Sequence, residues 1–137
     1  MYRHLAVAVF ITVTLAACGG VTSPSNNKQE TFGNGNDVLK PGVGASFSYP
    51  FTVSNTGELT IALTQLNPGV STTTVFSIGY GIPQSGSCSP INFNTVATVG
   101  FPAISGDQVT KGSYCVFIQD EGLITVPETF TLTVSHP

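Results

Sequence analysis

The stretch "SFSYPFTVSNTGELTIALTQL", Ser46 to Leu66, decides the fold expected for this chain. Apolar and polar side chains alternate in both of its halves, first at Phe47, Tyr49, Phe51 and Val53 and then at Leu59, Ile61 and Leu63. A period of two is typical of strands that place one face on a core. Because Asn55 to Gly57 has turn chemistry, we expect a hairpin that joins the two strands. Pro50 predicts that the first strand lies at a sheet edge or carries a bulge.

The same alternation recurs toward the C-terminus. It places apolar residues at Phe76, Ile78 and Tyr80, at Ile91 and Phe93, at Tyr114, Val116 and Ile118, and at Phe130, Leu132 and Val134. The segment Ser105 to Ser113, "SGDQVTKGS", is typical of a turn, and no window of 11 or more residues after Cys18 has helical spacing. We therefore predict an all-β fold, an antiparallel two-sheet β-sandwich of six to eight strands. The aromatic side chains at alternating positions are expected in its core.

Length and composition limit the function classes. The 137 residues suit a single domain, and 15 Gly and 9 Pro suit short strands with tight turns. The chain has four basic and seven acidic residues, and the basic ones, Arg3, Lys28, Lys40 and Lys111, are scattered. A nucleic-acid partner is not expected, because such binding needs clustered positive charge.

The N-terminus has the pattern of a secretory signal peptide. Met1 to His4 carries Arg3, and the 13 residues from Leu5 to Ala17 carry no charge and end in small residues. As a helix these residues would extend only about 20 Å, short of the ~30 Å hydrocarbon core of a bilayer. Residues 1–17 are therefore interpreted as a signal-peptide helix that is removed, rather than as a transmembrane span.

At the end of this run, "LAAC" from Leu15 to Cys18 resembles the lipobox of bacterial lipoproteins at every position. The resemblance implies cleavage between Ala17 and Cys18 and a diacylglyceryl group on the Cys18 sulfur, which would anchor the protein to a membrane of the bacterial cell envelope. Gly19 stands where an aspartate would favour the inner membrane, so the outer membrane is favoured if the cell is Gram-negative. The alternative is an ordinary signal peptide with Cys18 free.

The segment after Cys18, "GGVTSPSNNKQET" from Gly19 to Thr31, has no apolar periodicity. Its Gly, Ser, Asn and Pro content is typical of a flexible tether. The chain is thus expected to divide into a signal peptide (1–17), a lipidated cysteine with a tether (18–31) and a β-sandwich domain (32–137).

The order of "FSYPFTVSNTGELTIAL", "KGSYCVFIQDEG" and "ETFTLTVSHP" resembles the bacterial pre-peptidase C-terminal domain, a small β-sandwich found on secreted proteins. Gly112, Tyr114, Val116 and Ile118 match its Gly-aromatic strand, and Phe130, Leu132 and Val134 match its closing strand with Phe in place of Tyr. The middle strand appears here as "TVFSIGYG", without the family's aspartate. No role of that aspartate is carried over.

The chain has three cysteines. With Cys18 occupied by lipid, as the lipobox resemblance implies, Cys88 and Cys115 remain. Export to an oxidising compartment favours a disulfide between them, with Cys88 in the loop "SGSCSP" and Cys115 in a strand.

Candidate catalytic and metal-binding residues are few. His136 is the only histidine after the signal peptide, and its place next to the chain end predicts an exposed tail residue rather than a catalytic base. Neither catalytic residues nor a metal site are therefore predicted. Oxygen ligands for calcium occur in "GNGND" (33–37) and "QDEG" (119–122), but turn chemistry explains both.

Taken together, these patterns predict a non-catalytic, lipid-anchored binding or structural module. No cofactor is expected apart from the lipid on Cys18, and the expected partners are the membrane and an envelope protein or glycan. One alternative is an accessory domain that works with a separately encoded secreted or envelope enzyme, such as a peptidase. A carbohydrate-binding module is a weaker alternative, because Thr and aromatic residues are plentiful but Trp is absent.

Overall fold

The computed structural model describes residues 24–69 and 76–137. Ala17, Cys18, the signal peptide and the start of the tether lie outside the described residues. The described elements are η1 (Pro24–Asn26), β1 (Lys28–Phe32), β2 (Val38–Leu39), β3 (Ser46–Val53), β4 (Gly57–Asn67), β5 (Phe76–Gln84), β6 (Ser87–Ala97), β7 (Pro102–Val109), β8 (Gly112–Asp120) and β9 (Glu128–His136). None of the helical structure in these ranges is long and apolar enough to cross a membrane.

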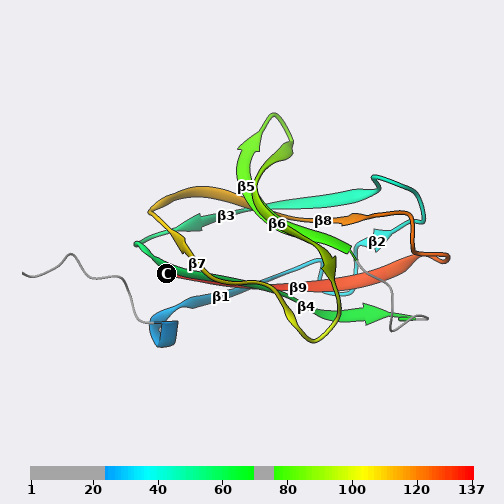
Figure 1. The fold of residues 1–137 in the computed structure, drawn as a ribbon, viewed down its shortest axis with the longest axis horizontal. Helices are drawn as coiled ribbons and strands as arrows, with labels where there is room; N and C mark the ends of the chain where they lie inside the picture. The colour runs from blue at the N-terminus through cyan, green and yellow to red at the C-terminus, as the bar shows by residue number, and fades with distance from the viewer. Residues whose placement is uncertain (1–23, 70–75) are drawn as a thin grey trace, which may run out of the picture.

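The strands form two antiparallel sheets that pack face to face (Figure 1). One sheet has the order β1-β9-β4-β7, with β2 also paired to β9, and the other has the order β3-β8-β5-β6. This confirms the expected all-β two-sheet sandwich. The described ranges hold nine strands rather than six to eight, because β1 and the two-residue β2 add short pairings to β9.

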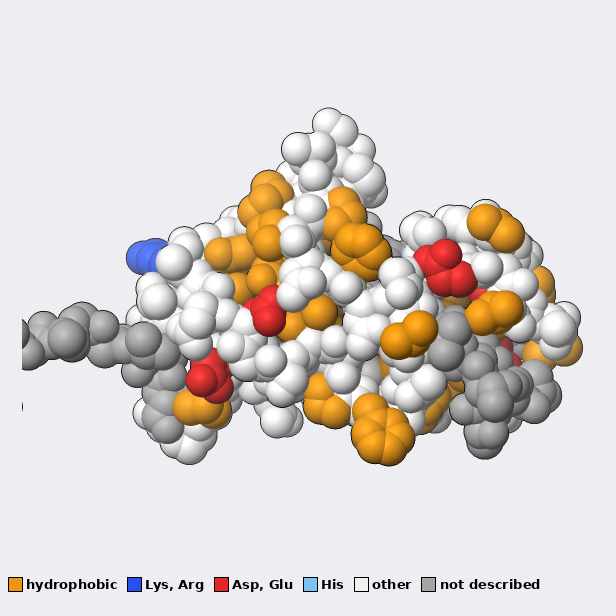
Figure 2. Space-filling view, viewed as in Figure 1, with side chains coloured by type: hydrophobic (Ala, Val, Ile, Leu, Met, Phe, Trp, Pro, Cys, Tyr) orange, Lys and Arg blue, Asp and Glu red, His pale blue; other side chains and the backbone are white. Residues whose placement is uncertain are grey.

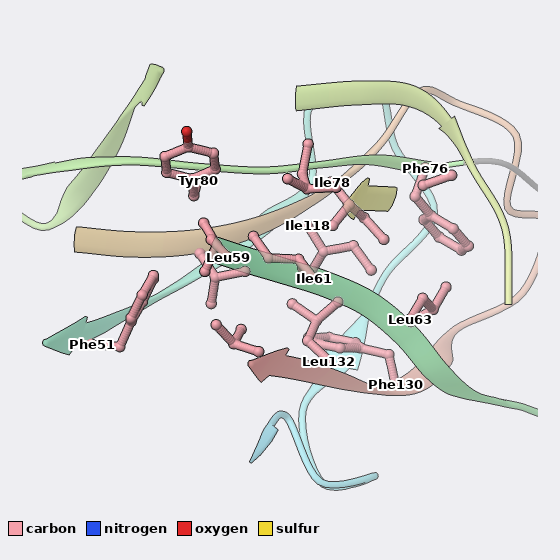
Figure 3. Packing of buried hydrophobic residues seen from close by; sticks show 14 of the residues in the cluster. Phe51, Leu59, Ile61, Leu63, Phe76, Ile78, Tyr80, Ile118, Phe130 and Leu132 are labelled. Atoms are coloured by element: carbon pink, nitrogen blue, oxygen red, sulfur yellow. The ribbon is translucent and has the colours of Figure 1, made fainter. Parts of the chain in front are cut away.

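The core lies between the sheets and is filled by the alternating side chains of both (Figure 3). Ile78 and Ile118 of the four-stranded sheet face Ile61 and Leu132 of the five-stranded sheet, and all four are fully buried. Burying side chains of this size contributes about 1.5–3 kcal/mol each relative to exposure, so these two rows are a main source of stability.

The expected hairpin between Ser46–Val53 and the strand after Gly57 is wrong. β3 pairs with β8, whereas β4 pairs with β9 and β7, so residues 54–56 cross from one sheet to the other. Alternation shows which face of a strand is buried but not which strand supplies its hydrogen bonds. Pro50 does lie on an edge strand as predicted, because β3 ends its sheet.

Two segments interpreted as tether or turn belong to strands. Lys28–Phe32, at the end of the predicted tether, forms β1 and pairs with β9 from Lys28↔His136 to Phe32↔Leu132. The predicted turn at Ser105 largely belongs to β7, where Gly106, at φ 73°, falls at a register shift opposite Leu59 and Thr60. Backbone hydrogen bonds hold polar strands and bulged strands in place. Such segments do not need alternating apolar side chains, so the sequence pattern does not reveal them.

Candidate functional site

The outer face of the four-stranded sheet is the best candidate for a binding surface. The strand pairings place Ser48, Phe117, Gly79 and Phe93 in one row across β3, β8, β5 and β6. Their neighbours along the strands, Tyr49, Val116, Ile118 and Ile78 among them, point into the core. The row therefore lies on the side of the sheet that faces away from the sandwich.

Strand β6 coils closely across the outer face of β5, and two glycines make this possible. A Cβ atom on Gly79 would lie 2.3 Å from the backbone oxygen of Asn92, and one on Gly81 would lie 1.9 Å from that of Ser89. No side chain fits at either position. The close approach brings the rings of Phe93 and Phe117 to a centroid distance of 6.3 Å above Gly79.

A disulfide fixes this arrangement. Cys88 of β6 and Cys115 of β8 are bonded, with 5.8 Å between their Cα atoms, which confirms the predicted pairing. Cys115 is paired with Gly81 of the intervening strand β5, so the bridge passes over β5 and ties β6 to β8.

Cys88 lies in a strand and not in the predicted loop. Ser85 (φ 42°) and Gly86 (φ 86°) alone form the turn between β5 and β6. Two residues with positive φ make the tight turn that suits a two-residue hairpin, so β6 already begins at Ser87.

Two adjoining hollows lie on this face beside the β5–β6 hairpin. One of about 360 Å³ lies between β3, the hairpin turn and β8, and is lined by residues that include Ser46, Ser48, Ser87 and Gln119. The other, of about 270 Å³, is lined by residues that include Ser77, Phe93, Thr95 and Glu121. The two share Pro90, Phe117 and Gln119, so they form one continuous groove, which we call the outer groove.

The outer groove combines phenyl rings with hydroxyl and amide groups. The side chain of Phe93 is 49% exposed, whereas Phe117 is buried beneath it. Among the described residues that line the groove, Glu121 is the only one with a charged side chain, and it accepts a hydrogen bond from the Ser77 hydroxyl. Such a surface can hold an uncharged polar ligand by stacking and hydrogen bonding.

The exposure of Ile91 and Phe93 differs from the prediction that alternating aromatic and apolar residues lie in the core. The asparagines beside them reach toward β7: the exposed Asn92 donates from Nδ2 to Asp107 Oδ2 at 2.6 Å, and the half-buried Asn94 donates from Nδ2 to the Ala103 carbonyl at 3.3 Å. β6 therefore contacts β7 through these two asparagines, whereas Ile91 and Phe93 face solvent and Ala97, at the end of the strand, lies in the core. The alternation of Asn with apolar residues was the available signal, but alternation alone does not show that these apolar side chains face solvent.

His136 is not an exposed tail residue, as the sequence predicted. Its side chain is 1% exposed, because β9 continues to this residue and pairs it with Lys28 of β1. The ring packs against Phe51 at a centroid distance of 5.3 Å, and Nε2 lies 3.1 Å from Glu30 Oε1. A hydrogen bond from Lys28 and a weaker one from His136 lower the pKa of Glu30, with burial opposing them. His136 is thus part of a structural pair away from the outer groove.

The "QDEG" segment makes a turn around a buried carboxylate. Asp120 Oδ1 accepts hydrogen bonds from the backbone N–H groups of Gly122 and Leu123, both at 2.9 Å, and of Ile124 at 3.3 Å. Oδ2 accepts one from Gly42 at 3.0 Å. Burial alone would raise the pKa of Asp120, but the four donors outweigh it and hold this pKa below its ordinary value.

The "GNGND" segment also forms a turn, with positive φ at Gly33, Asn34 and Gly35. The carboxylate that ends it, Asp37, accepts a hydrogen bond from the Tyr49 hydroxyl. In the two described ranges, no group of three or more His, Cys, Asp or Glu side chains is placed to hold a metal ion.

Fold and site define a β-sandwich with a largely uncharged groove on the outer face of its four-stranded sheet, beside a β5–β6 hairpin that a disulfide ties to β8. The chain matches no protein-family model and no curated protein. The lipoprotein and pre-peptidase resemblances therefore stay predictions.

Proposed function

We propose that the protein is a non-catalytic, lipid-anchored module of the bacterial cell envelope that binds a ligand in its outer groove. The observation that carries the binding function is the groove itself, where a half-exposed phenyl ring lies among hydroxyl and amide groups on a face held by a disulfide.

The "LAAC" pattern at Leu15–Cys18 supports the anchor. Lipid attachment is a strong physical effect, because each buried CH₂ contributes about 0.8 kcal/mol and two acyl chains suffice for stable anchoring. The Cys88–Cys115 bond is compatible with this assignment, since it leaves Cys18 as the cysteine available for lipid.

The environment of His136 supports a non-catalytic function. A general base must reach substrate, and the imidazole here is enclosed by Phe51 and held by Glu30. The Ser77 hydroxyl in the groove has a carboxylate partner, Glu121, and His136, the histidine of the described ranges, is held elsewhere by Glu30.

The lining of the groove favours a neutral saccharide as the ligand. Hydroxyl and amide side chains can exchange hydrogen bonds with sugar hydroxyls, and Phe93 offers a ring for an apolar sugar face. This favours the carbohydrate-binding alternative over a peptidase partner.

Replacement of Cys18 by Ser tests the anchor. The wild-type protein should fractionate with membranes and the Cys18→Ser protein should not, as judged by blotting after a carbonate wash. Membrane retention of Cys18→Ser would contradict the lipoprotein assignment.

A glycan array with Phe93→Ala tests the groove. The wild type should bind neutral glycans, and Phe93→Ala should weaken binding about tenfold, the loss expected for one stacked ring. Leu123→Ala is the matched control, because Leu123 is similarly exposed but lies outside the groove. Equal effects of the two variants would contradict groove binding. A peptidase that co-purifies with the wild type and is lost with Phe93→Ala would instead support the accessory-domain alternative.

A further inference from the structure

The connection between β6 and β7 exposes apolar side chains to solvent. Phe101 is 71% exposed and Val99 41%, and Val96, next to the end of β6, is also exposed. The connection is held in place by a hydrogen bond from the Gly100 N–H to the Leu63 carbonyl, at 2.9 Å. Figure 2 shows apolar side chains along this side of the molecule, down to its lower margin. Exposed apolar side chains gathered in one connection mark a contact surface, unlike those scattered singly.

The sequence around this connection carries no charge. Between Glu58 and Asp107 there is no Asp, Glu, Lys or Arg. A charged side chain beside the apolar ones would oppose entry into a lipid interface, because a charge is costly to remove from water. The β6–β7 connection has no such neighbour in the sequence.

The proposed anchor would hold this side of the domain near a bilayer. Cys18 precedes Pro24 by six residues, so even a fully extended chain places the lipid within about 21 Å of η1. In Figure 1, η1 and the β6–β7 connection both project on the lower side, past the five-stranded sheet, whereas the β5–β6 hairpin projects on the upper side. Because the short tether joins the described chain at η1, it keeps the lower side of the domain within reach of the membrane.

We propose that the β6–β7 connection, through Val99 and Phe101, inserts into the interfacial region of the membrane that holds the lipid anchor. The inference rests on the proposed lipid anchor. Insertion of this connection would orient the domain: the five-stranded sheet faces the bilayer, and the β5–β6 hairpin with the outer groove faces away from the bilayer. A ligand then reaches the groove from the side opposite the membrane.

A tryptophan at position 101 tests the insertion. The chain contains no Trp, so Phe101→Trp supplies a single fluorescent reporter. The full-chain protein, purified from membranes, is reconstituted into phosphatidylcholine vesicles. Its emission should shift to shorter wavelength than in detergent-free buffer and should be quenched by brominated acyl chains. The matched control is Val43→Trp, because Val43 is 85% exposed but belongs to the connection before β3, on the upper side of Figure 1. Its emission should stay solvent-like and unquenched.

The mass of the N-terminal peptide from the same preparation separates the two proposals. Acylated Cys18 with a solvent-like reporter at position 101 would overturn the insertion and leave the anchor intact. Unmodified Cys18 with a quenched reporter would overturn the anchor and support the insertion. A spectral shift that depends on protein concentration and occurs without vesicles would assign the surface to a second copy of the chain, and would also overturn the insertion.

Discussion

Replacement of Asp120 by Asn should destabilise the domain, because this buried carboxylate ties two loops together. Its oxygens accept four backbone hydrogen bonds, three on Oδ1 and one on Oδ2. Its neighbours along β8 and the following turn, Gln119 and Glu121, line the outer groove. Asp120 thereby also fixes the backbone that presents side chains of the outer groove.

The magnitude follows from the bonding pattern. The carbonyl oxygen of Asn can replace Oδ1 and keep three bonds, but its NH₂ group would then face the Gly42 N–H, donor against donor. One charge-assisted hydrogen bond is lost, which costs about 1.5–3 kcal/mol. For a domain of this size that loss lowers Tm by roughly 6–12 °C, at about 4 °C per kcal/mol.

The destabilisation by Asp120→Asn should also depend on pH. The pKa of Asp120 is lowered in the folded protein, so its contribution to stability is complete above the ordinary carboxyl pKa of 3.8 and is lost as the pH falls through the folded pKa. The difference in unfolding free energy between wild type and Asp120→Asn should therefore be constant near neutral pH and should shrink below about pH 4.

Urea unfolding between pH 3 and pH 7 measures both effects. Glu58→Gln on β4 is the control, since the Glu58 side chain makes none of these bonds. If Asp120→Asn and Glu58→Gln lose the same free energy at pH 7, and the loss by Asp120→Asn does not change with acid, the role given to Asp120 is refuted.

Three further predictions concern other parts of the fold. Replacing Cys88 and Cys115 together by Ala should lower the unfolding free energy by about 3–4 kcal/mol, from the 28-residue loop (115 − 88 + 1) that the bond closes; equal urea midpoints for this variant and the oxidised wild type would refute it. His136→Ala should cost about 2–4 kcal/mol in thermal unfolding, because it empties a buried site, whereas a loss under about 0.5 kcal/mol would mean an exposed tail. Burial, and then the hydrogen bond to Asp107, raise the pKa of Tyr80 to about 12, so ultraviolet titration should find this phenol protonated at pH 11. The associated stability should be present below pH 10 and lost as the pH rises toward 12; ionisation near pH 10 would contradict the burial.

The alternating apolar residues were enough to predict the class of fold. Phe130, Leu132 and Val134 lie in the core as their period of two required. The pairing of β3 and β4 was not predictable in the same way, because both strands bury one face in the same core while their hydrogen bonds go to different sheets. β1 was missed because its partner, β9, lies about 100 residues away and the pairing is made by backbone groups.

The outer groove could be predicted only in part. The cysteine pairing followed from the count of three with one assigned to lipid, and it correctly joined two distant segments. Phe93 was expected in the core because alternation alone does not distinguish an inward from an outward face. Gly79 and Gly81 permit β6 to coil over β5, and this places Phe93 on the outer face. The sequence alone does not show this effect, because it depends on backbone contacts that form only in the folded chain.

Mass spectrometry of the N-terminal tryptic peptide tests the central claim, that the protein is a membrane-anchored module, most directly. The chain has no Lys or Arg between Cys18 and Lys28, so trypsin should release one peptide from the mature N-terminus to Lys28. We predict a peptide that begins at Cys18 and carries a thioether-linked diacylglyceryl group. A mature protein with an unmodified Cys18, or with a different first residue, would contradict the lipid anchor.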